Sequence, residues 1–157
     1  MDDAKKIELI YKIVEELLEK MAIEGKIKAK IIDQDEQELI WVNIETKQDP
    51  RFLIGQKGSN LASFQHLARL MTRLKIPTEK VAFTIDVNQY KEKRLAYLRK
   101  LAQTSAREVL ATKEPLILDA MPAHERRVVH LALADSEGVA TESIGEEGER
   151  QVMIKPE

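Results

Sequence analysis

The chain has 157 residues, of which 43% are hydrophobic and none is cysteine. This length is enough for one medium domain or two small ones, and the lack of cysteine excludes a disulfide framework and a thiolate metal site. The acidic start Met1-Asp2-Asp3 is unlike a secretory signal, and no apolar run approaches the ~20 residues of a membrane span. The sequence therefore predicts a cytoplasmic protein without membrane insertion.

The net charge of −2 conceals three segments that differ in sign. Residues 1–50 hold 8 Lys/Arg against 13 Asp/Glu, and residues 114–157 hold 4 against 10. Residues 51–113 hold 13 against 4, a net charge of +9. Such asymmetry indicates a polyanion-binding surface, but a solvated helix face balanced by acidic neighbours has the same composition. Charge alone leaves both interpretations open.

Hydrophobic periodicity predicts the first elements in chain order. Apolar residues at three-four spacing predict a helix from Asp3 to Ile23, with Gly25 as its stop signal. Alternating residues predict strands over 26–32 and 38–44, joined by a polar hairpin turn over 33–37.

Further elements surround a glycine-containing turn. We expect a short helix from Pro50 that ends at Gly55, a longer helix from Ser59 to about Leu74, and a strand from Val81 to Val87. Trp41 could stack on a nucleic-acid base, but a lone tryptophan in an apolar strand is more often a core residue. The longer helix carries a broad apolar stripe, formed by Leu61, Phe64, Leu67, Ala68, Leu70, Met71 and Leu74.

The turn Ile54-Gly55-Gln56-Lys57-Gly58-Ser59 has the composition of a phosphate-binding loop. Its glycines permit positive φ and close approach to a ligand, and Lys57 adds a mobile charge. We expect Ser59 or Asn60 to cap the next helix, whose free N–H groups favour an anion. Taken alone, however, Gly-x-x-Gly is more typical of a plain helix-helix turn.

The predicted order is helix, two strands, short helix, Gly-x-x-Gly, longer helix and strand, which is an α+β arrangement with helices on one face of a three-stranded sheet. In this order and this loop, residues 1–88 resemble a KH domain of the prokaryotic type II. The resemblance implies that the loop clamps the backbone of about four single-stranded nucleotides, with Ile54 and Leu61 on the groove floor. The RNA-binding residues that it implies are Ile54, Gly55, Gln56, Lys57, Gly58 and Ser59.

A long helix is predicted from the N-cap Asn88 to about Thr112. Its internal acidic residues are Glu92 and Glu108, which leaves few ion-pair partners for its cations. The two interpretations are contact with nucleic acid along part of the helix and an ordinary solvated face. The basic residues of this helix are Lys91, Lys93, Arg94, Arg99, Lys100 and Arg107.

The last part of the chain predicts a small α/β unit. It contains a short strand over 116–118, a helix from Pro122 to about Asp135, and strands over 139–144 and 151–154, the last two joined by an acidic turn. This unit needs the preceding long helix for a core. We therefore place the boundary near Asn88 and assign residues 89–157 to a second domain.

Arg126 and His130 are four residues apart and share one helical face. Alone, Arg-xxx-His is usually an ordinary surface pair. The segment from Met121 to His130, with the later strand and Arg150, resembles the R-three-H domain, a single-stranded nucleic-acid-binding module. The binding residues that this resemblance implies are Arg126, Arg127, His130, Thr141, Ser143 and Arg150.

A KH domain followed directly by an R-three-H domain resembles the bacterial Jag family, also called SpoIIIJ-associated, KhpB or EloR. The resemblance implies single-stranded RNA binding, with single-stranded DNA as a second possible ligand, and post-transcriptional regulation linked to cell elongation, division or sporulation. It also implies a small single-KH partner protein and possible homo-oligomers. Many members begin with a separate N-terminal Jag domain, whereas this chain begins at the KH helix.

The sequence lacks the signatures of an enzyme. It contains no nucleophile-base pattern, no paired metal-ligand carboxylates and no Gly-Lys-Ser/Thr phosphate loop. We therefore expect no catalytic residues, no metal and no cofactor. The alternative function is a protein-protein scaffold that pairs with another KH protein and binds RNA or single-stranded DNA only secondarily.

Overall fold

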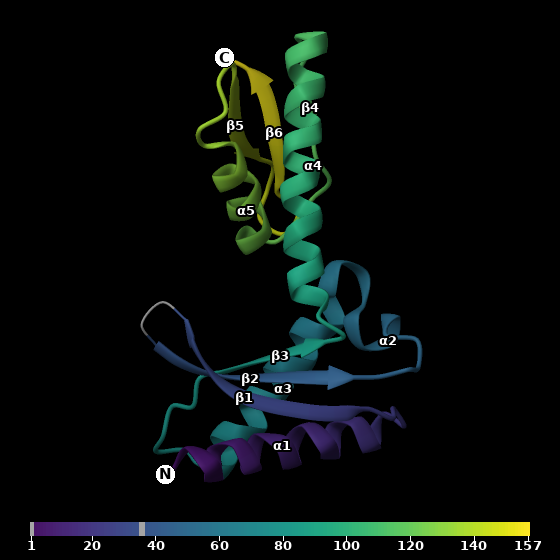
Figure 1. The fold of residues 1–157 in the computed structure, drawn as a ribbon, viewed down its shortest axis with the longest axis vertical. Helices are drawn as coiled ribbons and strands as arrows, with labels where there is room; N and C mark the ends of the chain where they lie inside the picture. The colour runs from purple at the N-terminus through teal and green to yellow at the C-terminus, as the bar shows by residue number, and fades with distance from the viewer. Residues whose placement is uncertain (1, 35–36) are drawn as a thin grey trace. The chain divides into compact units, whose positions relative to one another are not determined.

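The computed structural model describes residues 2–34 and 37–157, which form two compact units, Met1–Lys91 and Glu92–Glu157. Each unit contains a three-stranded sheet and helices (Figure 1), so the α+β fold class is confirmed. None of the helices in the described part of the chain is long and apolar enough to cross a membrane.

The first unit places its helices on one face of a sheet with the order β1-β2-β3 (Figure 1). Strands β1 and β2 form an antiparallel hairpin, and β2 pairs with β3 in parallel. The elements of this unit are α1 (Asp3–Lys20), β1 (Lys26–Gln34), β2 (Gln37–Glu45), α2 (Arg51–Ile54), a 3₁₀ turn (Gln56–Gly58), α3 (Ser59–Lys75) and β3 (Phe83–Val87). Part of the hairpin turn expected over 33–37 falls on residues 35–36, which lie outside the described residues.

Helix α1 ends earlier than the sequence predicts. Ala22 takes a left-handed φ of 54°, and the Ile23 N–H donates to the Leu18 carbonyl at 3.0 Å, which closes the helix without a glycine. Gly25 has a different role, because a Cβ there would lie 2.9 Å from Ile44 Cγ2. The predicted stop signal is therefore a packing glycine at the start of the hairpin.

The core of the first unit lies between α1, α3 and the inner face of the sheet. Ile13 of α1, Phe64 of α3 and Val42 of β2 are buried there. Strand alternation places Trp41 on the opposite face, where it is half-buried, so the core assignment of Trp41 is wrong. Its neighbours Ile40 and Val42 occupy the inner face.

The apolar stripe of α3 is wider than the core requires. Leu61, Phe64 and Ala68 are buried, but Leu67, Leu70 and Leu74 are 46%, 45% and 82% exposed. A helix that packs on one side buries a stripe about 100° wide, so the remaining leucines face outward. Only part of the predicted apolar stripe therefore lies in the core.

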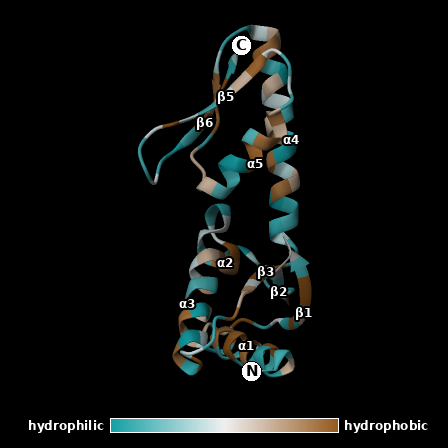
Figure 2. Cartoon of the chain, turned by 90° about the vertical axis from the view of Figure 1, so that its left-hand side faces the viewer, coloured by the Kyte–Doolittle hydropathy of each residue, from teal (hydrophilic) through white to brown (hydrophobic). Residues whose placement is uncertain are grey.

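The second unit is built on the long helix α4. Its elements are α4 (Tyr90–Thr112), β4 (Leu116–Ile117), α5 (Ala123–Leu133), β5 (Val139–Ile144) and β6 (Gln151–Pro156), of which the first two residues of α4 group with the first unit. The sheet is antiparallel with the order β4-β6-β5. Leu98 and Val109 of α4 are fully buried with Val129 of α5 and Ile154 of β6. The alternation of apolar and polar residues along α4 can be followed in Figure 2.

Candidate nucleic-acid interface

The Gly-x-x-Gly loop has a backbone conformation that depends on glycine. Gly55 ends α2 with φ 71° and ψ −176°, backbone angles that residues other than glycine essentially never adopt. Lys57 and Gly58 follow in left-handed conformations, with φ 52° and 83°. A Cβ at Gly55 would lie 2.6 Å from Asn60 Cγ and 2.7 Å from the Asn60 backbone nitrogen. The loop and the first turn of α3 therefore touch at Gly55.

Asn60 fastens the loop but does not cap the helix in the expected way. Its side-chain amide donates to the Phe52 carbonyl of α2 at 2.9 Å. Gly58 is the N-cap of α3 and makes no side-chain cap hydrogen bond, and Ser59 already has helical dihedral angles. The capping prediction for Ser59 and Asn60 is wrong, because Asn60 ties the loop back to α2. The first turn of α3 therefore lacks a side-chain cap, an arrangement suited to an external anion.

The predicted loop residues all lie on this one turn. Gln56 and Ser59 are exposed, whereas Ile54 and Lys57 are half-buried. The sequence prediction missed Tyr90, whose ring carbon Cε1 would lie 3.0 Å from a Cβ at Gly58. An aromatic residue at the start of a helix carries no motif, so only the structure reveals this contact.

Side chains of α3 occupy the outer edge of β3. Gln65 Oε1 accepts from the Ile85 N–H at 3.1 Å, and Arg69 Nη2 donates to the Phe83 carbonyl at 3.1 Å. A hollow of about 660 Å³ lies beside this edge, with Arg73 and Lys80 in its lining. The edge strand is thereby protected from pairing with another strand, and basic side chains border the hollow.

His130 connects α5 to strand β5. Its Nδ1 lies 2.7 Å from Thr141 Oγ1, and its Nε2 lies 2.8 Å from Ser143 Oγ. Both hydroxyls lie on one face of β5 because they are two residues apart. The imidazole is thus held by two hydroxyl groups, each of which can donate or accept a hydrogen bond.

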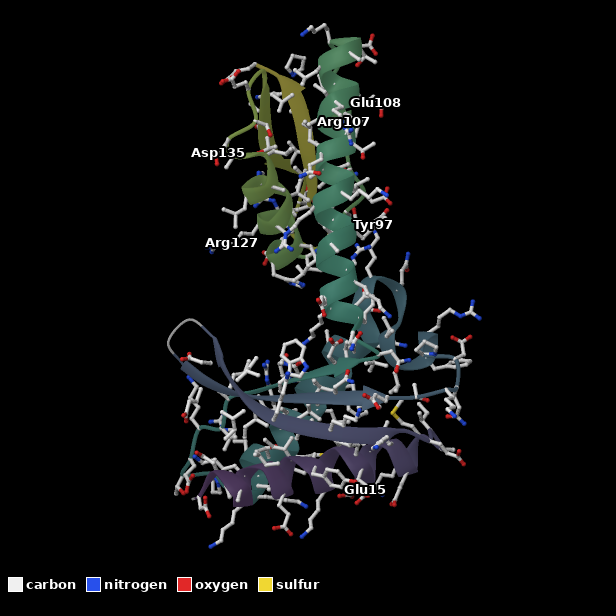
Figure 3. All side chains as sticks on the ribbon, viewed as in Figure 1. Glu15, Tyr97, Arg107, Glu108, Arg127 and Asp135 are labelled. Atoms are coloured by element: carbon white, nitrogen blue, oxygen red, sulfur yellow. The ribbon has the colours of Figure 1, made fainter. Side chains whose placement is uncertain are left out.

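Two arginines lie beside this histidine group. Arg126 Nη1 donates to the Met121 carbonyl at 2.9 Å, and Arg150 Nη2 donates to the Ser143 carbonyl at 3.1 Å. Both arginines line a hollow of about 450 Å³ together with Gly148. The structure thus brings together five of the six residues predicted for the R-three-H site. Arg127 is exposed and projects away from α5 (Figure 3), so it does not join them.

The pKa of His130 lies below its ordinary value near 6.5, first because of burial and second because of the Arg126 charge. The unfolded chain therefore binds more protons than the folded chain when the pH falls through about 6.5. We expect the free energy of unfolding to be fully retained above that pH and to decrease as the pH falls toward the lowered pKa. Denaturant unfolding at pH 7.5 and pH 5.5 measures this decrease, which should be smaller in a His130→Gln variant. An equal decrease in both proteins would rule out His130 as the cause.

The predicted basic helix contains two residues that serve structural contacts. The Lys91 amine donates to Thr84 Oγ1 at 2.6 Å and to Gln65 Oε1 at 3.0 Å, and burial lowers the pKa of Lys91. Arg94 forms a two-bond ion pair with Glu125 of α5, with distances of 2.9 and 3.0 Å. Lys91 and Arg94 therefore do not belong to an exposed basic surface. Lys93, Arg99 and Lys100 are exposed.

The sequence leaves few ion-pair partners within this helix, and Arg94 has its partner on α5 instead. Its partner Glu125 lies 31 residues later in the chain, too far for helical periodicity to indicate.

Within the described ranges, 2–34 and 37–157, no group of three or more histidine and acidic side chains could hold a metal ion.

Comparison with known proteins assigns a domain family to the second unit. The family model of the R-three-H domain matches residues 96–156. The chain is 38% identical over 109 residues to the RNA-binding protein KhpB of Lactiplantibacillus plantarum, covering 69% of this chain and 33% of that protein. It is 36% identical over 114 residues to KhpB of Clostridium symbiosum, covering 72% and 51% of the two chains.

A third relative covers more of both chains. KhpB of Bacillus subtilis is 30% identical over 135 residues, which is 85% of this chain and 63% of that protein. The chain therefore spans between about a third and less than two thirds of the length of these relatives. Their similarity extends beyond the R-three-H match into the first unit, since an alignment of 135 residues cannot fit within residues 96–156. The chain belongs to the Jag (KhpB) family.

Proposed function

We propose that this chain binds single-stranded RNA without catalysis, with the Gly-x-x-Gly loop as its backbone clamp. The observation that carries the proposal is the loop geometry. Gly55 takes a glycine-only conformation, and the first turn of α3 has no side-chain cap. A glycine-dependent turn that leads into a helix without a side-chain cap supports a phosphate contact at this loop. The RNA-binding names of the KhpB relatives support the same ligand.

The second proposed contact is the group around His130. Arg126 and Arg150 border one hollow, and the imidazole stands beside them between two hydroxyls. A guanidinium binds phosphate through two parallel hydrogen bonds, while an imidazole can bond to a phosphate or a base. Two weak sites in one chain raise the affinity for a strand that reaches both of them. Phosphate contacts should make this affinity decrease with salt.

A double variant, Gln56→Asp with Lys57→Asp, tests the loop. We expect the affinity for single-stranded RNA to fall at least about tenfold, because charge-assisted bonds to phosphate are replaced by repulsion. Fluorescence anisotropy of a labelled RNA measures the affinity. The control, Lys5→Asp with Gln103→Asp, makes the same change in net charge at exposed positions of α1 and α4. Unchanged affinity in a stably folded loop variant would disprove the role of the loop.

The cellular role that we propose rests on the family resemblance alone. It is post-transcriptional regulation linked to cell elongation, division or sporulation. Crosslinking the protein to cellular RNA and sequencing the bound fragments gives both the targets and the base preference. Recovery of no specific fragments would contradict a regulatory role.

The exposed leucines of α3 favour a second candidate function, a scaffold that pairs with another KH protein. Leu67, Leu70 and Leu74 lie at three-four spacing on one helical face and are all exposed. A contiguous apolar strip of this kind is typical of a protein-protein contact. Light scattering with and without nuclease separates the two functions, because a scaffold complex survives removal of RNA. A chain that remains monomeric with every KH protein tested would contradict the scaffold.

A further inference from the structure

The single tryptophan of the protein lies on the outer face of the first sheet. Its neighbours Ile40 and Val42 point into the core, so Trp41 points to the opposite side. In the sheet register Trp41 lies between Lys30 of β1 and Thr84 of β3. The half-buried indole is therefore at the centre of three strands.

Cations stand on both sides of this indole. Lys30 is exposed and directly opposite Trp41 on β1. On the β3 side, Lys91 Nζ lies 6.0 Å from the ring centroid and is held by the Thr84 hydroxyl. An aromatic ring flanked by cations is the usual composition of a platform for single-stranded nucleic acid.

The carboxylates of this face already have partners. Glu45 forms an ion pair with Lys28 at 2.6 Å, and Asp86 Oδ1 accepts from the Val87 and Lys91 N–H groups at 2.8 and 3.1 Å. Among the side chains that the structure describes, none pairs with Lys30. The charge next to Trp41 is therefore positive and suited to a polyanion.

On the same face, the side-chain amide oxygen of Asn43 receives no hydrogen bond from the part of the chain that the structure describes. Asn43 lies two residues along β2 from Trp41, and its buried Oδ1 has no partner among the described residues. A buried acceptor without a partner is costly to the folded protein.

Two consecutive residues connect this face with the Gly-x-x-Gly loop. Tyr90 packs against Gly58, and the next residue, Lys91, stands beside Trp41. The loop and the outer face are therefore linked through adjacent residues at the start of α4.

We propose that the outer sheet face is a further contact surface for single-stranded RNA, where a base stacks on Trp41 while the exposed Lys30 holds the adjacent phosphate. The proposal rests on RNA binding as proposed above and adds a second surface within the first unit. An indole that only shields the sheet from water would not respond to RNA. The single tryptophan makes this difference measurable.

The test titrates the full chain with a labelled oligoadenylate RNA and follows two signals. Anisotropy of the RNA label reports binding by any site, and emission of Trp41 reports the outer face. We expect the emission to be quenched in step with the anisotropy, and Lys30→Glu to weaken the quenching. Trp41→Leu should lower the affinity about five- to tenfold, and Trp41→Phe less, because the smaller ring still stacks. Tyr11→Leu, on the exposed side of α1, is the matched control and should leave the affinity unchanged.

Two results would overturn the inference and are distinguishable from each other. If RNA binds while the Trp41 emission and the Trp41→Leu affinity stay unchanged, the outer face is not an RNA surface, and the proposed function remains. If the anisotropy shows no RNA binding by the folded protein, both proposals fail. An emission that changes with protein concentration and not with RNA would assign the face to a protein contact and also overturn the inference.

Discussion

A Gly55→Ala substitution is expected to lower the free energy of unfolding of the first unit by about 2–3 kcal/mol and to weaken RNA binding at least tenfold. Alanine disfavours the φ of 71° and ψ of −176° at this position. Its Cβ would also lie 2.6–2.7 Å from Asn60 atoms, including the backbone nitrogen. The first turn of α3 must therefore move, and with it the proposed phosphate-binding N–H groups.

The matched control for Gly55→Ala is Gly148→Ala. Gly148 also has a positive φ, 92°, but no atom lies within 4 Å of the position that its Cβ would take. The free energy of unfolding of this variant should fall by about 1 kcal/mol, which is the cost of the left-handed conformation alone. Denaturant unfolding followed by Trp41 emission reports the first unit for Gly55→Ala, and circular dichroism reports the second unit for Gly148→Ala. An equal loss in the free energy of unfolding for the two variants would show that the contact with Asn60 does not oppose a Cβ at position 55.

A Glu125→Ala substitution is expected to lower the free energy of unfolding of the second unit by about 3 kcal/mol. The Glu125 and Arg94 side chains are 4% and 19% exposed and share two hydrogen bonds of 2.9 and 3.0 Å. Removing the carboxylate takes these two charge-assisted hydrogen bonds from a largely buried guanidinium. It also removes a negative charge from the first turn of α5, where the helix dipole favours one.

Glu142→Ala is the control for Glu125→Ala. Glu142 pairs with Lys155 at 2.8 Å, but both side chains are largely exposed, and Lys155 lowers the pKa of Glu142. Exposed pairs are screened by water, so this variant should leave the stability of the unit nearly unchanged. Thermal unfolding followed by circular dichroism measures both variants. A loss no larger for Glu125→Ala than for Glu142→Ala would show that the buried pair contributes little.

Local patterns in the sequence predicted the elements well because they depend on neighbours. Alternation predicted the strands of both sheets, and glycine spacing located the loop at Gly55 and Gly58. The Arg126 and His130 pair follows from helical periodicity, and resemblance added Thr141, Ser143 and Arg150 to it. In the structure His130 lies between Thr141 and Ser143, and Arg150 bonds to the Ser143 carbonyl, while the binding role of these residues stays a prediction.

Long-range contacts account for the errors. The side chain of Asn60 bonds back to α2 instead of capping α3, and the cation of Arg94 is neutralised by a carboxylate 31 residues away. Lys91 turns toward Thr84 and leaves the basic helix surface. None of these partners lies within one helical turn in the sequence, so periodicity could not indicate them.

The sequence by itself determined the order of the elements and the glycines of the loop, because dihedral preferences and apolar spacing act over a few residues. The family followed from the resemblance of its two motifs. Only the tertiary structure decided which cations are exposed, which leucines of α3 are left outside the core, and which face of the sheet carries Trp41. The physical reason is that burial and charge pairing depend on which elements pack together. Those contacts join residues that are far apart in the chain.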